Sequence, residues 1–206
     1  MEDLTPLVNY VKKYIPLTEG EESFFISLLQ VTKVKKRQYI HQPGYICQYR
    51  NYVLKGALRA FISDNNGQEH TISLAIEDWW IADPASFILR EPGTFFVEAV
   101  EDSTIVQISY EAEQQLMQQY PKFERFYRVT SQLTAIHAQK RLLSNISQTA
   151  EERYETFAGR YSQLLQRFPL YIIASYLGMT REFLSKIRNR NLPPAQQTTD
   201  SSNNVN

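Results

Sequence analysis

Residues 170–189, LYIIASYLGMTREFLSKIRN, constrain the fold of this chain most, because apolar and small residues flank a central glycine. Two short helices that cross steeply need this pattern. Ala174 is small where the second helix must approach closely, and Gly178 can adopt positive φ at the turn. Thr180 can cap the second helix, and Glu182 lies in its first turn, where a negative charge suits the helix dipole. The stretch therefore predicts a helix–turn–helix.

The solvent face of the predicted second helix is basic and polar. It carries Arg181, Ser185, Lys186, Arg188 and Arg190. Such a helix, held on a compact support, has the geometry that enters a DNA major groove. The alternative is an ordinary helical hairpin with a solvated basic face. The net charge of the whole chain is zero, so only this local patch indicates a nucleic-acid partner.

Composition excludes several classes of protein. The 206 residues suffice for one large domain or two small ones, and 43% of them are hydrophobic, which is enough for a packed core. We find no run of about 18 apolar residues, so we expect no membrane span. The N-terminal stretch does not read as a signal peptide. Cys47 is the single cysteine, which excludes an intrachain disulfide and fits a reducing, cytoplasmic location.

The first half of the chain predicts a helix followed by a β domain. Thr18 and Glu21 form a capping box for a helix from about 19 to 30. From residue 32 to about Ser109, short stretches rich in Val, Ile, Tyr and Thr alternate with turn signals, which is typical of a β-sandwich or barrel. Asn66-Gly67 is a strong hairpin signal within that region.

The second half predicts helices again. Ser109 can cap a short helix over 110–119, and a longer helix restarts at Pro121. Apolar residues follow 3–4 spacing along it, interrupted by Lys140: Phe126, Val129, Leu133, Ile136 and Leu143. Such a stripe can pack within the chain or against a second copy.

A hinge is predicted at residues 145–148, before the C-terminal helices. Thr149 and Glu152 form a second capping box, for a helix through residue 165. Pro169 marks the start of the next helix. The polar residues 192–206 are expected to be disordered.

The order of helix, β-roll, long helix and helix–turn–helix resembles the catabolite-activator (CRP/FNR) family of bacterial transcription regulators. The likeness covers about 19–191. Gly44 and the turn Val53-Leu54-Lys55-Gly56 match the usual glycine turns of the family's roll. GMTREFLSKI at 178–187 is similar to the family signature Gly-x-Ser/Thr-Arg-Glu-x-x-x-Arg.

The resemblance implies an α+β fold: an antiparallel, double-stranded β-helix roll of the cyclic-nucleotide-binding type, with flanking helices. It implies a sensor domain over 1–120, a dimerisation helix over 121–146 and a DNA-binding domain over 149–191. The family's usual β-hairpin wing is missing, since only the polar tail follows.

The resemblance also assigns roles on the recognition helix. Arg181, Glu182, Ser185 and Lys186 would read bases, while Thr180, Arg188 and Arg190 would contact phosphates. Lys186 stands where the family usually has arginine, so the planar fork is lost and base preference can differ. The expected partners are double-stranded DNA and a second copy of the chain, with RNA polymerase as a further candidate.

Residues 79–99 correspond to the family's phosphate-binding stretch, here called the ligand cassette, and they depart from the family pattern. Nucleotide-binding members carry Gly-Glu and then an arginine, whereas this chain has Ala82-Asp83 and, near the arginine position, Gly93-Thr94. A carboxylate that caps the helix begun by Pro84 would compete for the amides that bind phosphate. The candidate pocket residues are Ala82, Asp83, Ser86, Arg90, Thr94 and Gln139. Arg90 is the only nearby cation in this reading. We therefore expect no cyclic nucleotide, while another small-molecule effector stays open.

The sequence gives little support for a metal site, a haem site or an aromatic ligand site. His41, His70 and His137 lack metal-site spacing. His41 and Cys47 could be haem ligands, but a buried thiol and a strand histidine are the simpler reading. The aromatic residues Trp79, Trp80, Phe87, Phe95 and Phe96 could line a pocket for a planar effector or simply fill the core.

No arrangement of catalytic residues stands out, so we expect no enzyme and no cofactor. The alternative to a DNA-binding regulator is a sensing module that controls a partner protein without DNA binding.

Overall fold

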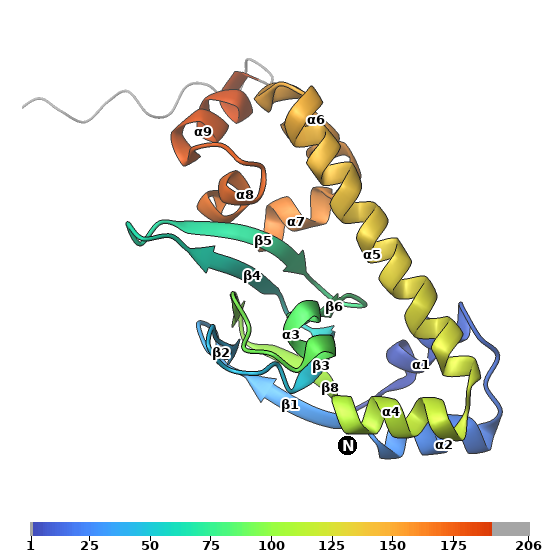
Figure 1. Cartoon of the computed structure of the whole chain (residues 1–206). Coiled ribbons are helices and arrows are strands. Elements are labelled where there is room, and N and C mark those ends of the chain that lie inside the picture. Colours follow the sequence, from blue (N-terminus) through green and yellow to red (C-terminus); the bar gives the residue numbers. More distant parts are fainter. Residues whose placement is uncertain (1, 191–206) are drawn as a thin grey trace, which may run out of the picture. The chain divides into compact units, whose positions relative to one another are not determined.

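The computed structural model describes residues 2–190, which separate at Leu142–Leu143 into two units (Figure 1). The first unit contains a β-roll with flanking helices, and the described part of the second is helical. The long helix α5 (Lys122–Ser147) begins in the first unit and ends in the second. The predicted tail over 192–206, where a wing would follow α9, lies outside the described residues.

The roll consists of two four-stranded antiparallel sheets, with the orders β1-β8-β3-β6 and β2-β7-β4-β5. The strands are β1 (Gln30–Val34), β2 (Tyr39–His41), β3 (Tyr49–Lys55), β4 (Leu58–Ser63), β5 (Glu69–Ala75), β6 (Trp80–Ile81), β7 (Phe96–Ala99) and β8 (Ser103–Ser109). Inward-facing aliphatic side chains of both sheets, among them Val53, Leu58, Val97 and Ile105, form the core between them. The predicted α+β fold with an antiparallel β-roll is confirmed.

The hairpin between β4 and β5 forms where Asn66-Gly67 predicts it. The Asp64 carboxylate accepts the amides of Asn66 and Gln68, each at 2.9 Å. An aspartate at the start of such a loop satisfies amides that the ladder leaves unpaired.

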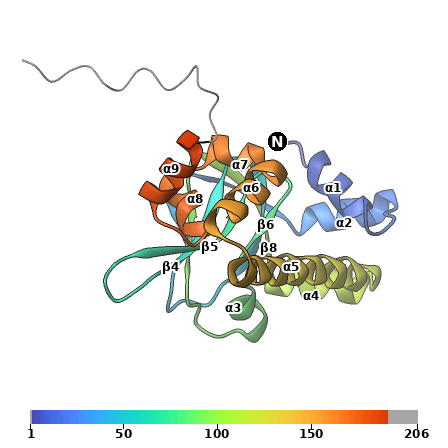
Figure 2. The ribbon, with the colours of Figure 1, turned by 90° about the horizontal axis from the view of Figure 1, so that it is seen from above.

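One sheet of the first unit is covered by helices: α1 (Thr5–Lys12), α2 (Glu19–Ser27), α4 (Tyr110–Gln119) and the first turns of α5. The short helix α3 (Pro84–Leu89) follows β6. A second core joins α1, α2, α4 and α5 to β3 and β8, with Phe25, Tyr52, Leu116 and Phe126 fully buried. Figure 2 shows α4 beside the start of α5.

Two of the predicted helix starts in this unit are confirmed, and one predicted end is wrong. Thr18 and Glu21 make the capping box of α2, and Ser109 caps α4. However, α2 ends at Ser27 rather than near 30, because Gln30 already pairs with Gln107 in the sheet.

The middle and end of α5 expose apolar side chains. Phe126 is buried, but Leu133, Ile136 and Leu143 of the predicted stripe are exposed, and Leu142 and Ile146 extend it. Ile146 is 74% exposed. No helix within residues 2–190 is both long and apolar enough to cross a membrane.

The second unit contains α6 (Ala150–Arg160), α7 (Ser162–Arg167), α8 (Leu170–Tyr176) and α9 (Arg181–Arg190). The Thr149–Glu152 capping box of α6 is confirmed. The break between helices falls at the end of the predicted hinge 145–148, because α5 stays helical to Ser147 and the Gln148 amide still donates to Ser144 O at 3.0 Å. One prediction is wrong. The helix that follows stops at Arg160, where Tyr161 leaves helical geometry (φ −132°, ψ 45°).

Candidate DNA-binding helix and effector pocket

The turn between α8 and α9 has the geometry that its sequence predicts. Gly178 has φ +68°, a conformation that costs other residues more. The Met179 amide donates to Ala174 O at 3.0 Å, and the Gly178 amide donates to Ser175 O at 3.2 Å, so the last carbonyls of α8 are satisfied. Ala174 is buried beneath the turn. Figure 1 shows the two helices joined by this turn.

The predicted recognition helix, α9, buries an apolar side and exposes a charged one. Thr180 caps it, since its hydroxyl accepts the Phe183 amide at 3.2 Å. Leu184 and Ile187 are buried. Of the predicted DNA-contacting residues, Ser185 is half-buried and the others are exposed: Thr180, Arg181, Glu182, Lys186, Arg188 and Arg190. The basic face is thus available to a partner.

Sequence reasoning missed an arginine that supports the turn. In α6, Arg153 donates from Nε to Leu177 O at 3.0 Å and from Nη1 to Gln148 O at 2.8 Å. It therefore joins the end of α8 to the start of α6. Nothing in the sequence distinguishes Arg153 from a solvated helix arginine, because its acceptors are backbone carbonyls.

The cassette residues Asp83, Ser86 and Thr94 come together, and Asp83 lies at their centre. Its side chain is buried. Oδ1 accepts the Ser86 amide at 3.1 Å, and Oδ2 accepts the Thr94 amide at 3.2 Å. The predicted cap on α3 is therefore confirmed. Ser86 in turn accepts the Cys47 amide at 2.8 Å and donates to Glu91 O at 2.6 Å. The amides of Ser86, Thr94 and Cys47 therefore donate to protein side chains and not to a bound phosphate.

Arg90 is also held by protein groups. It has left-handed backbone geometry (φ 57°) at the end of α3. Its guanidinium donates to Cys47 O at 2.9 Å and to Gln48 Oε1 at 3.0 Å. The other two candidate pocket residues contribute less: Ala82 is half-buried, and Gln139 is exposed on α5.

A second cation lies beside α3, so the expectation that Arg90 is the only nearby one is wrong. Arg50 packs over the Phe87 ring at 4.7 Å and pairs with Glu113 at 2.7 Å. Burial raises the pKa of Glu113, and Arg50 opposes that rise. This ion pair joins β3 to α4, and its two residues are 63 positions apart in the sequence.

His41 packs against the same cassette. It is 7% exposed, and its Nε2 lies 3.8 Å from Asp83 Oδ2. Burial lowers the pKa of His41, and Asp83 acts in the opposite direction. A Cβ at Gly93 would lie 2.2 Å from His41 Nε2, so this approach requires glycine. Cys47 is buried, and burial raises the pKa of its thiol. Both residues fit the simpler reading of a strand histidine and a buried thiol.

The aromatic residues singled out in the sequence split into two groups. Trp80 packs in the helical core against Tyr52, with ring centroids 5.4 Å apart. Phe96 stacks on Phe61 at 5.0 Å in the other sheet. These side chains serve packing, and none of them lines the pocket that lies beside β2.

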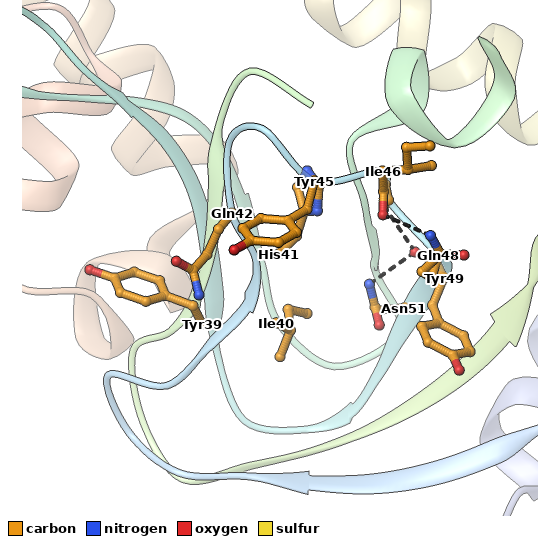
Figure 3. A pocket seen from close by; sticks show the side chains of 10 residues that line it. Tyr39, Ile40, His41, Gln42, Tyr45, Ile46, Gln48, Tyr49 and Asn51 are labelled. Carbon is orange, nitrogen blue, oxygen red and sulfur yellow. Dashed lines mark hydrogen bonds between the residues drawn. The ribbon is translucent and has the colours of Figure 1, made fainter. Parts of the chain in front are cut away.

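That pocket has a volume of about 280 Å³ and is lined by residues 39–42, 45–49 and 51. Figure 3 shows Tyr39 and Gln42 on one side of it, with Ile46, Gln48 and Asn51 on the other. Sequence reasoning missed it because its walls come from β2, the loop after it and the start of β3, which carry no motif.

The arrangement defines a class of fold, a cyclic-nucleotide-binding-type roll with a C-terminal helix–turn–helix, and comparisons agree. Residues 31–120 match the family model of the cyclic nucleotide-binding domain. A comparison with curated proteins found no match.

Solved structures of transcription regulators share the fold. FixK2 from Bradyrhizobium japonicum has a TM-score of 0.71 at 16% identity, covering 79% of this chain and 83% of that one. A putative regulator of the crp/fnr family from Eubacterium rectale has a TM-score of 0.66 at 19% identity, covering 86% and 87%. The c-di-GMP responsive regulator CLP of Xanthomonas campestris has a TM-score of 0.63 at 17% identity, covering 84% and 91%. The resemblance to the CRP/FNR family is confirmed at the level of the fold.

Proposed function

We propose that this chain is a sequence-specific DNA-binding transcription regulator and not an enzyme. The observation that carries the proposal is α9, a capped helix whose buried side rests on α8 and whose exposed side carries Arg181, Lys186, Arg188 and Arg190. Arginine and lysine on an exposed helix suit guanine edges and phosphates. Solved structures that share the fold include a putative transcriptional regulator of the crp/fnr family and the global regulator CLP, which supports the same class.

The regulator acts as a homodimer through α5. Leu133, Ile136, Leu143 and Ile146 leave apolar area on one long helix exposed to water, and a second copy of the helix would cover it. Two copies of α9 would then enter successive major grooves about 34 Å apart on a near-palindromic site.

The cassette does not serve a cyclic nucleotide in this proposal. Asp83 brings a negative charge to the place where an anionic phosphate would bind, and it already accepts two amides. Arg90 is engaged by Cys47 and Gln48. An anion would have to displace these interactions and also overcome repulsion by the carboxylate.

Duplex binding at several salt concentrations tests the function. We expect the wild type to bind DNA more tightly as salt falls, because phosphate contacts release counterions. Arg188→Ala and Arg190→Ala should each lower the salt slope by about one unit. Lys36→Ala is the matched control, since it removes an exposed cation from the first unit.

Sedimentation tests the dimer in the same preparations. We expect a dimer for the wild type and a monomer for Ile146→Asp, because a charge on this exposed position opposes apolar packing. A dimer without DNA affinity at any salt would contradict the proposal and favour a sensing module that regulates a partner protein.

A further inference from the structure

The pocket beside β2 has the size and wall chemistry of a site for a small uncharged ligand. Its volume of about 280 Å³ is close to the lower end of ligand pockets, roughly 300 Å³. None of its lining residues is Asp, Glu, Lys or Arg. An ionic ligand would lose hydration there without gaining a charged partner.

Aromatic rings stand at the pocket without being buried. Tyr45 is 71% exposed, and Tyr39 is also exposed, although Tyr39 rests on Phe96 with centroids 5.2 Å apart. A planar aromatic ligand would cover these rings and gain stacking or edge contacts. The exposed amide of Gln42 adds a group that can donate or accept a hydrogen bond.

His41 belongs both to the pocket lining and to the surroundings of the cassette residue Asp83. This ring lines the pocket, yet within residues 2–190 its Nε2 is buried without a hydrogen-bond partner. The nearest charged group is the Asp83 carboxylate, 3.8 Å away, and that carboxylate holds the Thr94 amide. A buried polar atom left unsatisfied marks a place where a small displacement changes the hydrogen bonding.

We propose that this pocket binds a small, uncharged, planar aromatic molecule bearing a hydrogen-bonding group, and that His41 links its occupancy to the cassette loop 83–94. The regulatory meaning of this binding rests on the proposed function, whereas the binding itself belongs to the first unit alone. Phenol and indole represent the ligand class. Benzoate is a charged match, and cyclohexanol is a non-planar one.

The test is a titration of the full chain with each of these four compounds, followed by calorimetry and by NMR of the Thr94 amide and the His41 ring. We expect saturable binding of phenol and indole, with both signals shifting. Benzoate and cyclohexanol should bind at least about tenfold more weakly, since tenfold corresponds to about 1.4 kcal/mol.

Variants locate the site. Tyr45→Ala should weaken phenol binding about two- to tenfold, the loss of one aromatic contact, and it should not unfold the protein because Tyr45 is largely exposed. Tyr171→Ala is the control, an exposed tyrosine of α8 in the second unit that does not line the pocket. Its affinity for phenol should equal that of the wild type.

Several results would overturn the inference. Equal binding of benzoate would refute the uncharged class, and unchanged phenol affinity in Tyr45→Ala would refute the location. Binding that leaves the Thr94 and His41 signals in place would refute the link. Absence of saturable binding in a protein that binds duplex DNA would refute this inference and leave the proposed function standing. Binding of phenol by a protein without DNA affinity would support this inference and refute the proposed function.

Discussion

The predicted recognition helix α9 and the ligand cassette both carry polar and charged side chains on or next to a helix, but these side chains have opposite environments. In the cassette, the Asp83 carboxylate and the Arg90 guanidinium bond to backbone and side-chain groups of the same unit. In α9, Arg181 and Lys186 remain exposed to solvent. The difference indicates which region holds the protein together and which is available to a partner.

Burial explains the difference. Asp83 is 1% exposed, so its charge is stable only where donors replace the water it has lost. Exposed cations on α9 keep their hydration until a phosphate or base replaces it. A ligand that binds a site with completed hydrogen bonds must first break them, whereas the exposed cations of α9 are free of that cost, as the proposed DNA binding requires.

The largest expected effect concerns the exposed region. Arg181→Ala should reduce the preference for the best site over random DNA by about 1–3 kcal/mol, because a bidentate base contact is lost. Competition binding with matched and scrambled duplexes measures it. Arg190→Ala should weaken both duplexes alike. Equal sequence preference in the wild type and Arg181→Ala would contradict the base-reading role of Arg181.

A larger side chain in the ligand cassette should lower the stability of the first unit. Gly93→Ala places a Cβ 2.2 Å from His41 Nε2 and 2.9 Å from Asp83 Oδ2. We expect the free energy of unfolding of the first unit to fall by about 1–3 kcal/mol, as measured by urea denaturation. Gly20→Ala is the control, because nothing lies within 4 Å of its added Cβ. Comparable stability of the two variants would show that the cassette is loosely packed.

Removing the cap should give a slightly smaller loss. Asp83→Ala leaves the amides of Ser86 and Thr94 without their acceptor, so we expect a loss of about 1–2 kcal/mol in unfolding free energy. Amide hydrogen exchange should quicken at both positions. Unchanged exchange would mean that the carboxylate does not hold the loop.

The smallest effect is a pH dependence. The folded pKa of His41 lies below its ordinary value of 6.5, so the unfolded chain binds more protons than the folded one below that pH. The free energy of unfolding should therefore fall with decreasing pH below about 6.5, by at most about 1.4 kcal/mol per unit. Denaturation of the wild type and His41→Asn at several pH values isolates the contribution. Parallel pH profiles of the two proteins would exclude it.

Local signals in the sequence predicted much of this molecule. Thr18, Ser109 and Asp83 cap the helices that they were expected to cap, because a cap depends on neighbours a few residues away. Gly178 marked its turn for the same reason. Short strands and regular turns predicted a β-sandwich or barrel, and the resemblance to the CRP/FNR family implied the antiparallel roll.

Long-range contacts were not predictable. Arg50 and Glu113 are 63 residues apart, and Arg153 bonds to backbone carbonyls, which leave no trace in the sequence. The approach of His41 to Asp83 depends on how β2 and the cassette pack. The residues that line the pocket all lie within 39–51, but no motif in that stretch indicates that their side chains surround a cavity.

The central claim is that the chain reads DNA without a cyclic nucleotide. Selection of bound duplexes from a random DNA pool by the purified full chain, with and without cyclic AMP, tests it most directly. The account predicts that the same near-palindromic sequence is enriched in both arms. Enrichment only in the presence of cyclic AMP would contradict our interpretation of the cassette, and absence of enrichment in both arms would contradict the proposed recognition by α9.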